Sequence, residues 1–200
     1  GASNTAFGND ALTANTTGTG SAAVGANALD ANTTGNYNVA VGQHALGKNT
    51  TGANNIGIGY GSLSEILTVD NNTAVGHIAL TNSVGANNTA VGSGALTANT
   101  TGASGTAVGF DALKAVTTGG ENTAVGRSSG EALTTGIRNV AIGGYALYTA
   151  TTVNSNTAVG YSALQTNAAA DNTAVGRDAL KLNTTGTSNT AVGKGAMDAN

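Results

Sequence analysis

Few residues in this chain could carry acid–base chemistry near neutral pH, and the first candidates are its two histidines, His44 and His77. A catalytic site needs dissimilar ionisable groups that converge in a pocket, where burial shifts their pKa values. Both histidines stand at variable, solvent-facing positions of the short repeat described below. We therefore interpret them as surface residues and predict that the chain is not an enzyme and has no catalytic residue.

The sequence predicts no cofactor and no metal site either. The segment Gly57-Ile58-Gly59-Tyr60-Gly61 is spaced like a phosphate-binding loop, but no helical pattern follows it and no Lys-Ser/Thr pair ends it. Calcium-binding β-roll repeats need several aspartates per coil, whereas the whole chain has seven. Turns of the repeat are the simpler explanation of the glycines.

Five Asn-Thr-Thr segments are formally acceptors for N-linked glycans. They begin at Asn15, Asn32, Asn49, Asn99 and Asn183. Asn and Gly are also the residue types that tight turns prefer. We interpret these segments as turns, with glycosylation as the alternative.

One repeat accounts for the whole chain. Its consensus is Asn-Thr-Ala-Val-Gly-x-x-Ala-Leu-x-x-Asn-Thr-Thr-Gly-x-x, and the first Asn is position one. Position four falls at Phe7, Val24, Val41, Ile58, Val75, Val91, Val108, Val125, Ile142, Val159, Val175 and Val192. Nine of the eleven intervals between these residues are 17 residues long and two are 16.

Each copy has the pattern of one coil with two short strands. Thr-Ala-Val followed by Gly indicates the first strand, Ala-Leu begins the second, and Asn-Thr-Thr-Gly forms a turn. Because such a unit cannot bury its own apolar face, successive coils must stack. The sequence therefore predicts an all-β, parallel β-solenoid of about twelve 17-residue coils. We expect one array over residues 1–200, taken from a longer one because neither end departs from the repeat.

Composition excludes several partners. The chain has no Pro, Cys or Trp, its net charge is −3, and only 17 of its 200 residues are charged. Without a basic cluster or a long apolar run, the sequence predicts no binding to nucleic acid and no membrane contact in this segment.

The charged residues avoid positions one to five, eight and nine, which we therefore expect to be shielded or sterically restricted. We predict that positions two, four and nine fill the core. Repeat eight, where Gly130 takes the place of Leu and Leu133 follows, should be locally distorted. The Asn side chains at position one should form a hydrogen-bonded ladder.

Position three is small in every copy, and strand alternation would turn it away from that core. We predict that it packs against another chain. The residues of this expected interchain surface are Ala6, Ala23, Ala40, Gly57, Ala74, Ala90, Ala107, Ala124, Ala141, Ala158, Ala174 and Ala191. If the two faces are reversed, the Thr/Val face takes this role.

The strands Asn38-Val39-Ala40-Val41-Gly42 and Asn139-Val140-Ala141-Ile142-Gly143 resemble the head repeats of trimeric autotransporter adhesins, the YadA-like heads. This resemblance implies a left-handed β-roll and a homotrimer. The Asn-Thr-Ala-Val-Gly and Ala-Leu forms are also similar to repeats of phage tail fibres and bacterial surface proteins.

Together these features predict a structural or adhesive segment of an extracellular or cell-surface fibre, with a phage tail-fibre shaft as one alternative. A stacked Thr column makes an ice-binding solenoid the other alternative. Host-surface or matrix glycans or proteins could contact exposed aromatic residues. These are Tyr37, Tyr60, Phe110, Tyr145, Tyr148 and Tyr161.

Overall fold

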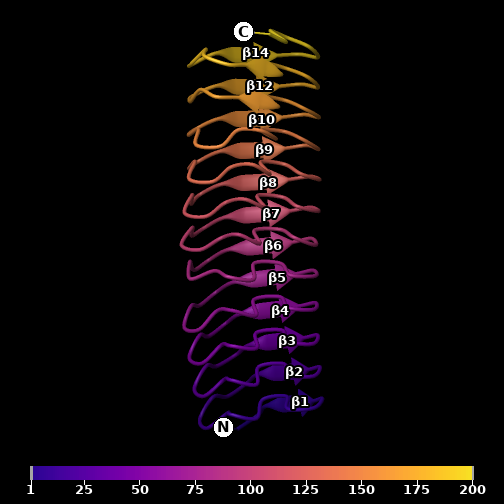
Figure 1. Ribbon diagram of the computed structural model, residues 1–200, viewed down its shortest axis with the longest axis vertical. Coiled ribbons are helices and arrows are strands. Elements are labelled where there is room, and N and C mark those ends of the chain that lie inside the picture. Colours follow the sequence, from indigo (N-terminus) through magenta and orange to yellow (C-terminus); the bar gives the residue numbers. More distant parts are fainter. Residues whose placement is uncertain (1, 200) are drawn as a thin grey trace.

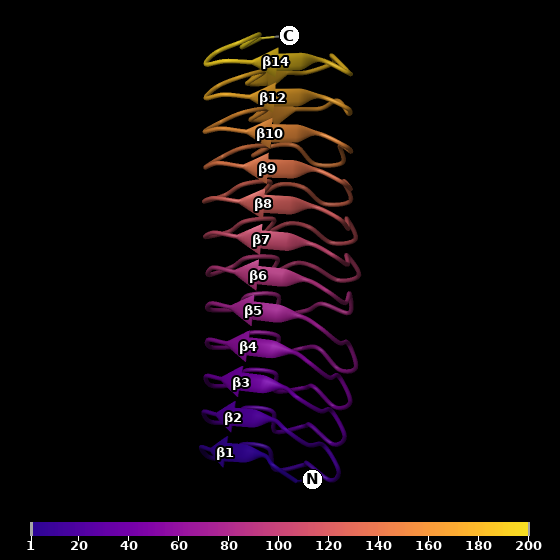
Figure 2. The same cartoon turned by 180° about the vertical axis from the view of Figure 1, so that it is seen from behind.

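The computed structural model describes residues 2–199, which form one column of stacked coils (Figure 1). Twelve strands pair in chain order into a single parallel sheet, and the chain termini lie at opposite ends of the column (Figure 1, Figure 2). The described residues contain no helix. The predicted all-β, parallel β-solenoid with coils of about 17 residues is confirmed.

Every strand of the main sheet is three residues long and covers positions two to four of its repeat. These strands are β1 (Thr5–Phe7), β2 (Ala22–Val24), β3 (Val39–Val41), β4 (Ile56–Ile58), β5 (Thr73–Val75), β6 (Thr89–Val91), β7 (Thr106–Val108), β8 (Thr123–Val125), β9 (Val140–Ile142), β10 (Thr157–Val159), β12 (Thr173–Val175) and β14 (Thr190–Val192).

The strands stack in register, so that like positions of neighbouring repeats lie beside one another. Ala107 of β7 pairs with Ala90 of β6 and Ala124 of β8. The two 16-residue coils keep this register, because Thr73 still pairs with Thr89 and Thr157 with Thr173. Every residue type that recurs along the chain therefore forms a continuous column along the rod.

The expected second strand is wrong for most coils. Ala-Leu lies in a turn, and its leucines have left-handed backbone angles, such as φ 51° at Leu29 and 50° at Leu113. Backbone hydrogen bonds still join the Ala-Leu turns of neighbouring coils, since the N–H of Leu113 donates to the carbonyl of Ser129 at 3.0 Å. Within residues 2–199, β11 (Thr166–Asn167) and β13 (Leu182–Asn183) are the only elements that pair as strands outside the main sheet.

A left-handed angle at a non-glycine residue costs free energy of the order of 1 kcal/mol. The compensation is burial, because Leu29 is fully buried and Leu113 is 1% exposed. Burying a leucine side chain stabilises a fold by about 1.5–3 kcal/mol. The turn therefore persists because it directs a large side chain into a thin core.

Repeat eight keeps the common fold, so the expected distortion there is wrong. Gly130 has φ 58°, close to the angle of the leucines that it replaces. Leu133, three residues later, is fully buried. A Cβ added to Gly130 would lie 2.8 Å from Cδ2 of Leu113 and 3.1 Å from Cδ1 of Leu133, so leucines of two neighbouring coils occupy the space that a larger side chain at position nine would need.

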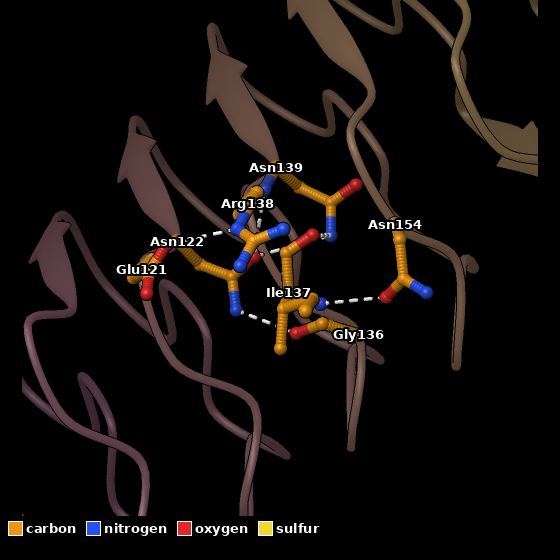
Figure 3. Close-up of polar contacts among 7 residues, drawn as sticks. All are labelled: Glu121, Asn122, Gly136, Ile137, Arg138, Asn139 and Asn154. Atoms are coloured by element: carbon orange, nitrogen blue, oxygen red, sulfur yellow. Dashed lines mark hydrogen bonds and ion pairs between the residues drawn. The ribbon is translucent and has the colours of Figure 1, made fainter.

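The predicted ladder at position one is present, and it binds mainly backbone groups (Figure 3). Oδ1 of Asn122 accepts the N–H of Asn139 at 2.9 Å, and Oδ1 of Asn139 accepts the N–H of Asn156 at 3.0 Å. Nδ2 of Asn122 donates to the carbonyl of Gly136 within its own coil at 2.7 Å. Amides with this pattern, such as Asn38, Asn88 and Asn122, close their own coil and bond to the next one.

A second ladder at position twelve runs through some of the coils and was not predicted. Nδ2 of Asn32 donates to Oδ1 of Asn15 at 3.1 Å, and Nδ2 of Asn49 donates to Oδ1 of Asn32 at 3.0 Å. The next coil carries Ile66, which cannot continue the ladder, and the buried Oδ1 of Asn49 has no partner within the described chain. Position twelve thus carries an amide, an apolar core residue or, at Ser83, a hydroxyl that accepts a hydrogen bond from Nδ2 of Asn99 at 3.2 Å.

Candidate interaction surfaces

The small residues of position three face the interior, so their predicted interchain role is wrong. Ala23, Ala40, Gly57, Ala74, Ala90, Ala107, Ala124, Ala141, Ala158, Ala174 and Ala191 are buried within the single chain. Ala6, in the first coil of the stack, is exposed. No neighbouring chain is needed to explain why the eleven buried positions are small.

Gly57 shows the physical cause of the small side chains. A Cβ at Gly57 would lie 3.2 Å from Cγ of Leu46 and 3.1 Å from Oγ of Ser62. These atoms belong to the wall opposite the sheet, so the coil is thin enough that a methyl group fills the gap. The steric restriction at position three comes from the chain's own leucine wall.

The first and third residues of every strand point outward and form what we call the sheet face. They were predicted to lie in the core, and that prediction is wrong. The third residues of six inner strands, such as Val24 and Ile142, are 37–39% exposed, and those at the two ends, Phe7 and Val192, are 76% and 70% exposed. The first residues of β2 to β12 are partly exposed as well, and eight of all twelve first residues are Thr.

No charged side chain occurs on the sheet face, although this face meets solvent along the whole rod. Charged side chains occur at positions six, seven, ten, eleven, sixteen and seventeen, while the exposed Thr-Thr pairs at positions thirteen and fourteen are also uncharged. A face that is uncharged in every coil and carries regular columns of half-exposed Val and Ile has the features of a contact surface. The alternative in which the Thr/Val face takes the interchain role is the one that fits this geometry.

A second surface, which we call the turn face, is formed by positions six, seven, ten and eleven. Five of the seven aromatic residues and both histidines lie on it. The aromatic residues are Tyr60, Phe110, Tyr145, Tyr148 and Tyr161. Unlike the sheet face, this surface differs from coil to coil.

The first hollow of the turn face has a volume of about 380 Å³ and lies beside Tyr60. The ring of Tyr60 stacks on His77 with centroids 5.5 Å apart, and His44 meets it edge-on at 6.3 Å. Nζ of Lys48 and Oε2 of Glu65 form an exposed ion pair on the same wall. The floor includes Ala31, Gly47 and Gly61.

The second hollow has a volume of about 480 Å³ and lies four coils further along the rod. Tyr148, Lys114 and Glu131 line it, and its floor is formed by small side chains such as Ala115 and Ala132. Lys114 donates to Asp111 at 3.0 Å, and this bond raises the pKa of the lysine above its usual value. The lysine is therefore held in its charged form.

A cluster of rings adjoins the second hollow. Tyr145 meets Tyr148 edge-on at 5.3 Å and Tyr161 at 5.7 Å, and the guanidinium of Arg127 lies 5.4 Å from the Tyr145 ring centroid. Such contacts hold exposed rings in place at the surface. Tyr148 is thus positioned by its neighbours as well as by its own coil.

The Asn-Thr-Thr segments are structural. Asn32, Asn49, Asn99 and Asn183 are buried, and Nδ2 of each donates a hydrogen bond to the glycine carbonyl three residues later. A glycan acceptor must expose this nitrogen. The turn interpretation fits the geometry, and the glycosylation alternative does not.

Residues 2–199 contain no group of three or more His, Cys, Asp or Glu side chains that could hold a metal ion. No helix in this part of the chain could span a membrane. Comparison with known proteins found no matching family model, no matching curated protein and no matching solved structure.

Proposed function

We propose that this chain is a rigid segment of an extracellular or cell-surface fibre, in which copies of the solenoid associate through their sheet faces. The fibre acts as a structural spacer or as the head of an adhesin, and a phage tail-fibre shaft would use the same architecture. The chain's resemblance to adhesin head repeats favours a homotrimer and left-handed coils.

The observation that carries the proposal is the sheet face. Its outward valines and isoleucines repeat in every coil after the first, where Phe7 takes their place, and they remain partly exposed in the single chain. Burying such columns would remove apolar area from water along the whole rod, at about 25 cal/mol per Å². The absence of charge from this face lets a second sheet approach without the cost of desolvating an ion.

The proposal is tested by placing charges on the sheet face and measuring mass in solution. Val108 and Val125 are adjacent outward residues of β7 and β8. The Val108→Glu/Val125→Glu double variant should sediment as a monomer in analytical ultracentrifugation, while the unaltered chain sediments as an oligomer. Circular dichroism should show that the variant keeps its β signal, because both side chains reach solvent.

A matched control places the same charge on the turn face. Ser93→Glu changes a half-exposed residue at position six, where other repeats carry Arg or Lys. This variant should keep the oligomer mass. If the unaltered chain is a monomer at all concentrations, or if the double variant assembles normally, the proposed association is wrong.

Ice binding is a second candidate, and the outward position of the Thr column favours it. Thr73, Thr89, Thr106 and Thr123 lie on four consecutive strands and are partly exposed. Parallel strands space their hydroxyls about 4.8 Å apart, which gives a regular flat array. Thermal hysteresis of the folded protein decides between the candidates, since a fibre segment produces none and an ice-binding protein shapes ice crystals.

A further inference from the structure

The two hollows of the turn face are built from the same kinds of side chain. Each has one tyrosine, one lysine and one glutamate on its walls, Tyr60 with Lys48 and Glu65 in the first and Tyr148 with Lys114 and Glu131 in the second. Small residues line both hollows, and the first also has Asp30 and His44. The turn face therefore presents two hollows of similar composition, although their tyrosines stand at positions six and ten of the repeat.

The hollows are elongated along the rod axis. The first is lined from Asp30 to Ile78 and the second from Ala98 to Thr149, so each spans four coils. Lys48 and Lys114 lie four coils apart, which is about 19 Å at the usual spacing of parallel strands, and Tyr60 and Tyr148 lie five coils apart. A ligand that meets both hollows must therefore be extended.

The charges of the hollows are nearly balanced. Lys48 is paired with Glu65, and Lys114 is paired with Asp111 and lies in the field of Glu131. A polyanion such as a nucleic acid or a sulfated glycan needs an excess of cations, which these sites lack. Paired carboxylates and ammonium groups beside an aromatic ring suit a neutral ligand that carries many hydroxyls.

We propose that the turn face binds a neutral, extended polysaccharide, laid along the rod and held at both hollows. The ring faces of Tyr60 and Tyr148 pack against the apolar faces of its sugar rings. The carboxylates and lysines of each hollow exchange hydrogen bonds with its hydroxyls. This inference specifies the adhesive part of the proposed function, and it does not depend on how the sheet faces associate.

The test uses the whole chain and two neutral β-linked probes, chitohexaose and cellohexaose, in titration calorimetry. We expect at least one probe to bind, with two sites per chain and little dependence on salt. Tyr60→Ala and Tyr148→Ala should each abolish measurable binding at one hollow. The double variant should show no measurable binding.

Tyr37→Ala is the matched control, because Tyr37 is 63% exposed and lies outside both hollows. It should bind the sugar as the unaltered chain does. The inference is overturned if neither probe binds, if the double variant binds normally, or if only heparin binds in a salt-sensitive manner. Binding of a protein partner in place of the sugars would also overturn it.

Sedimentation of the same samples separates this inference from the proposed association. The Tyr60→Ala/Tyr148→Ala variant should keep the oligomer mass and lose the sugar. The Val108→Glu/Val125→Glu variant should lose the oligomer mass and keep the sugar sites on each chain. The sugar-binding inference can therefore be overturned while the proposed association holds, and the association can be overturned while sugar binding holds.

Discussion

The sheet face and the turn face are built by the same twelve coils and meet the same solvent, yet they differ in composition. On the sheet face, Val, Ile, Thr and Ala recur from coil to coil and no charge is present. On the turn face, charges, aromatic rings and glycines alternate without a fixed order, and hollows form where small residues lie beside Tyr60 and Tyr148. Solvent exposure alone therefore does not explain the composition of the sheet face.

The comparison teaches that a repeat can specialise its two outer surfaces separately. A surface that contacts another regular surface along its whole length must carry uncharged residues of similar size in every coil. A surface that binds a ligand at a few places needs particular residues in only those coils. The following predictions test this contrast, from the largest expected effect to the smallest.

The largest effect on stability is expected at an inward-facing position of the sheet. Ala107 is fully buried, while its neighbour Val108 points outward in the same strand. Ala107→Glu would bury an unpaired carboxylate, at a cost of several kcal/mol, about 3–5 or more. Thermal denaturation followed by circular dichroism should show loss of the cooperative transition. Val108→Glu should remain folded, and equal stability of the two variants would contradict the inward position of the alanines.

A smaller loss is expected in the glycine column at position five. Gly109 has φ 141°, and a Cβ there would lie 2.4 Å from the carbonyl oxygen of Gly126 in the next coil. Gly109→Ala should lower the free energy of unfolding by about 2–4 kcal/mol, measured by urea denaturation.

The turn face supplies the control for this change. Gly61 also has a positive φ, 63°, but its added Cβ would meet only Cγ2 of Ile78 at 3.5 Å and Oγ of Ser64 at 4.0 Å. Gly61→Asn should cost less than about 1 kcal/mol, because Asn tolerates this backbone region. A loss equal to that of Gly109→Ala would show that close stacking is not what requires the glycine.

A gain in stability of about 1 kcal/mol is expected at Gly105, where the ladder of position one is interrupted. Gly105→Asn would supply an acceptor for the N–H of Asn122 and a donor for the carbonyl of Gly119. The added Cβ would lie 3.1 Å from Oδ1 of Asn88, so this neighbour must shift slightly. Gly105→Ala is the control in urea denaturation, and a variant with Asn that is no more stable than the Ala variant would show that the ladder adds nothing there.

The smallest effect is expected for the ion pair of Lys48 and Glu65 on the turn face. Their side chains are 61% and 41% exposed, and exposed pairs contribute about 0.2–1 kcal/mol. Glu65→Gln should change the free energy of unfolding by less than about 0.5 kcal/mol, and high salt should reduce the difference further. A larger change would indicate that this pair stabilises the coil stack itself.

Much of the fold could be predicted because the repeat is nearly perfect. The 17-residue period, the parallel stacking, the ladder at position one and the turn at Asn-Thr-Thr-Gly all follow from residue types that recur at fixed spacing. The turn face could be predicted only as a set of exposed aromatic residues. Its hollows depend on neighbours from different coils, such as Ala31, Lys48 and Tyr60, whose proximity a linear sequence does not display.

By itself, the sequence determined that the chain stacks in register and that position three must be small. Only the tertiary structure decided which way that position faces. Because side chains alternate along a strand, positions two and four share one face and position three lies on the other. The alternation does not determine which of the two faces points inward. The leucine side chains of the opposite wall decide this, because they fill the thin coil and leave room for a methyl group at Ala107 while the valines remain outside.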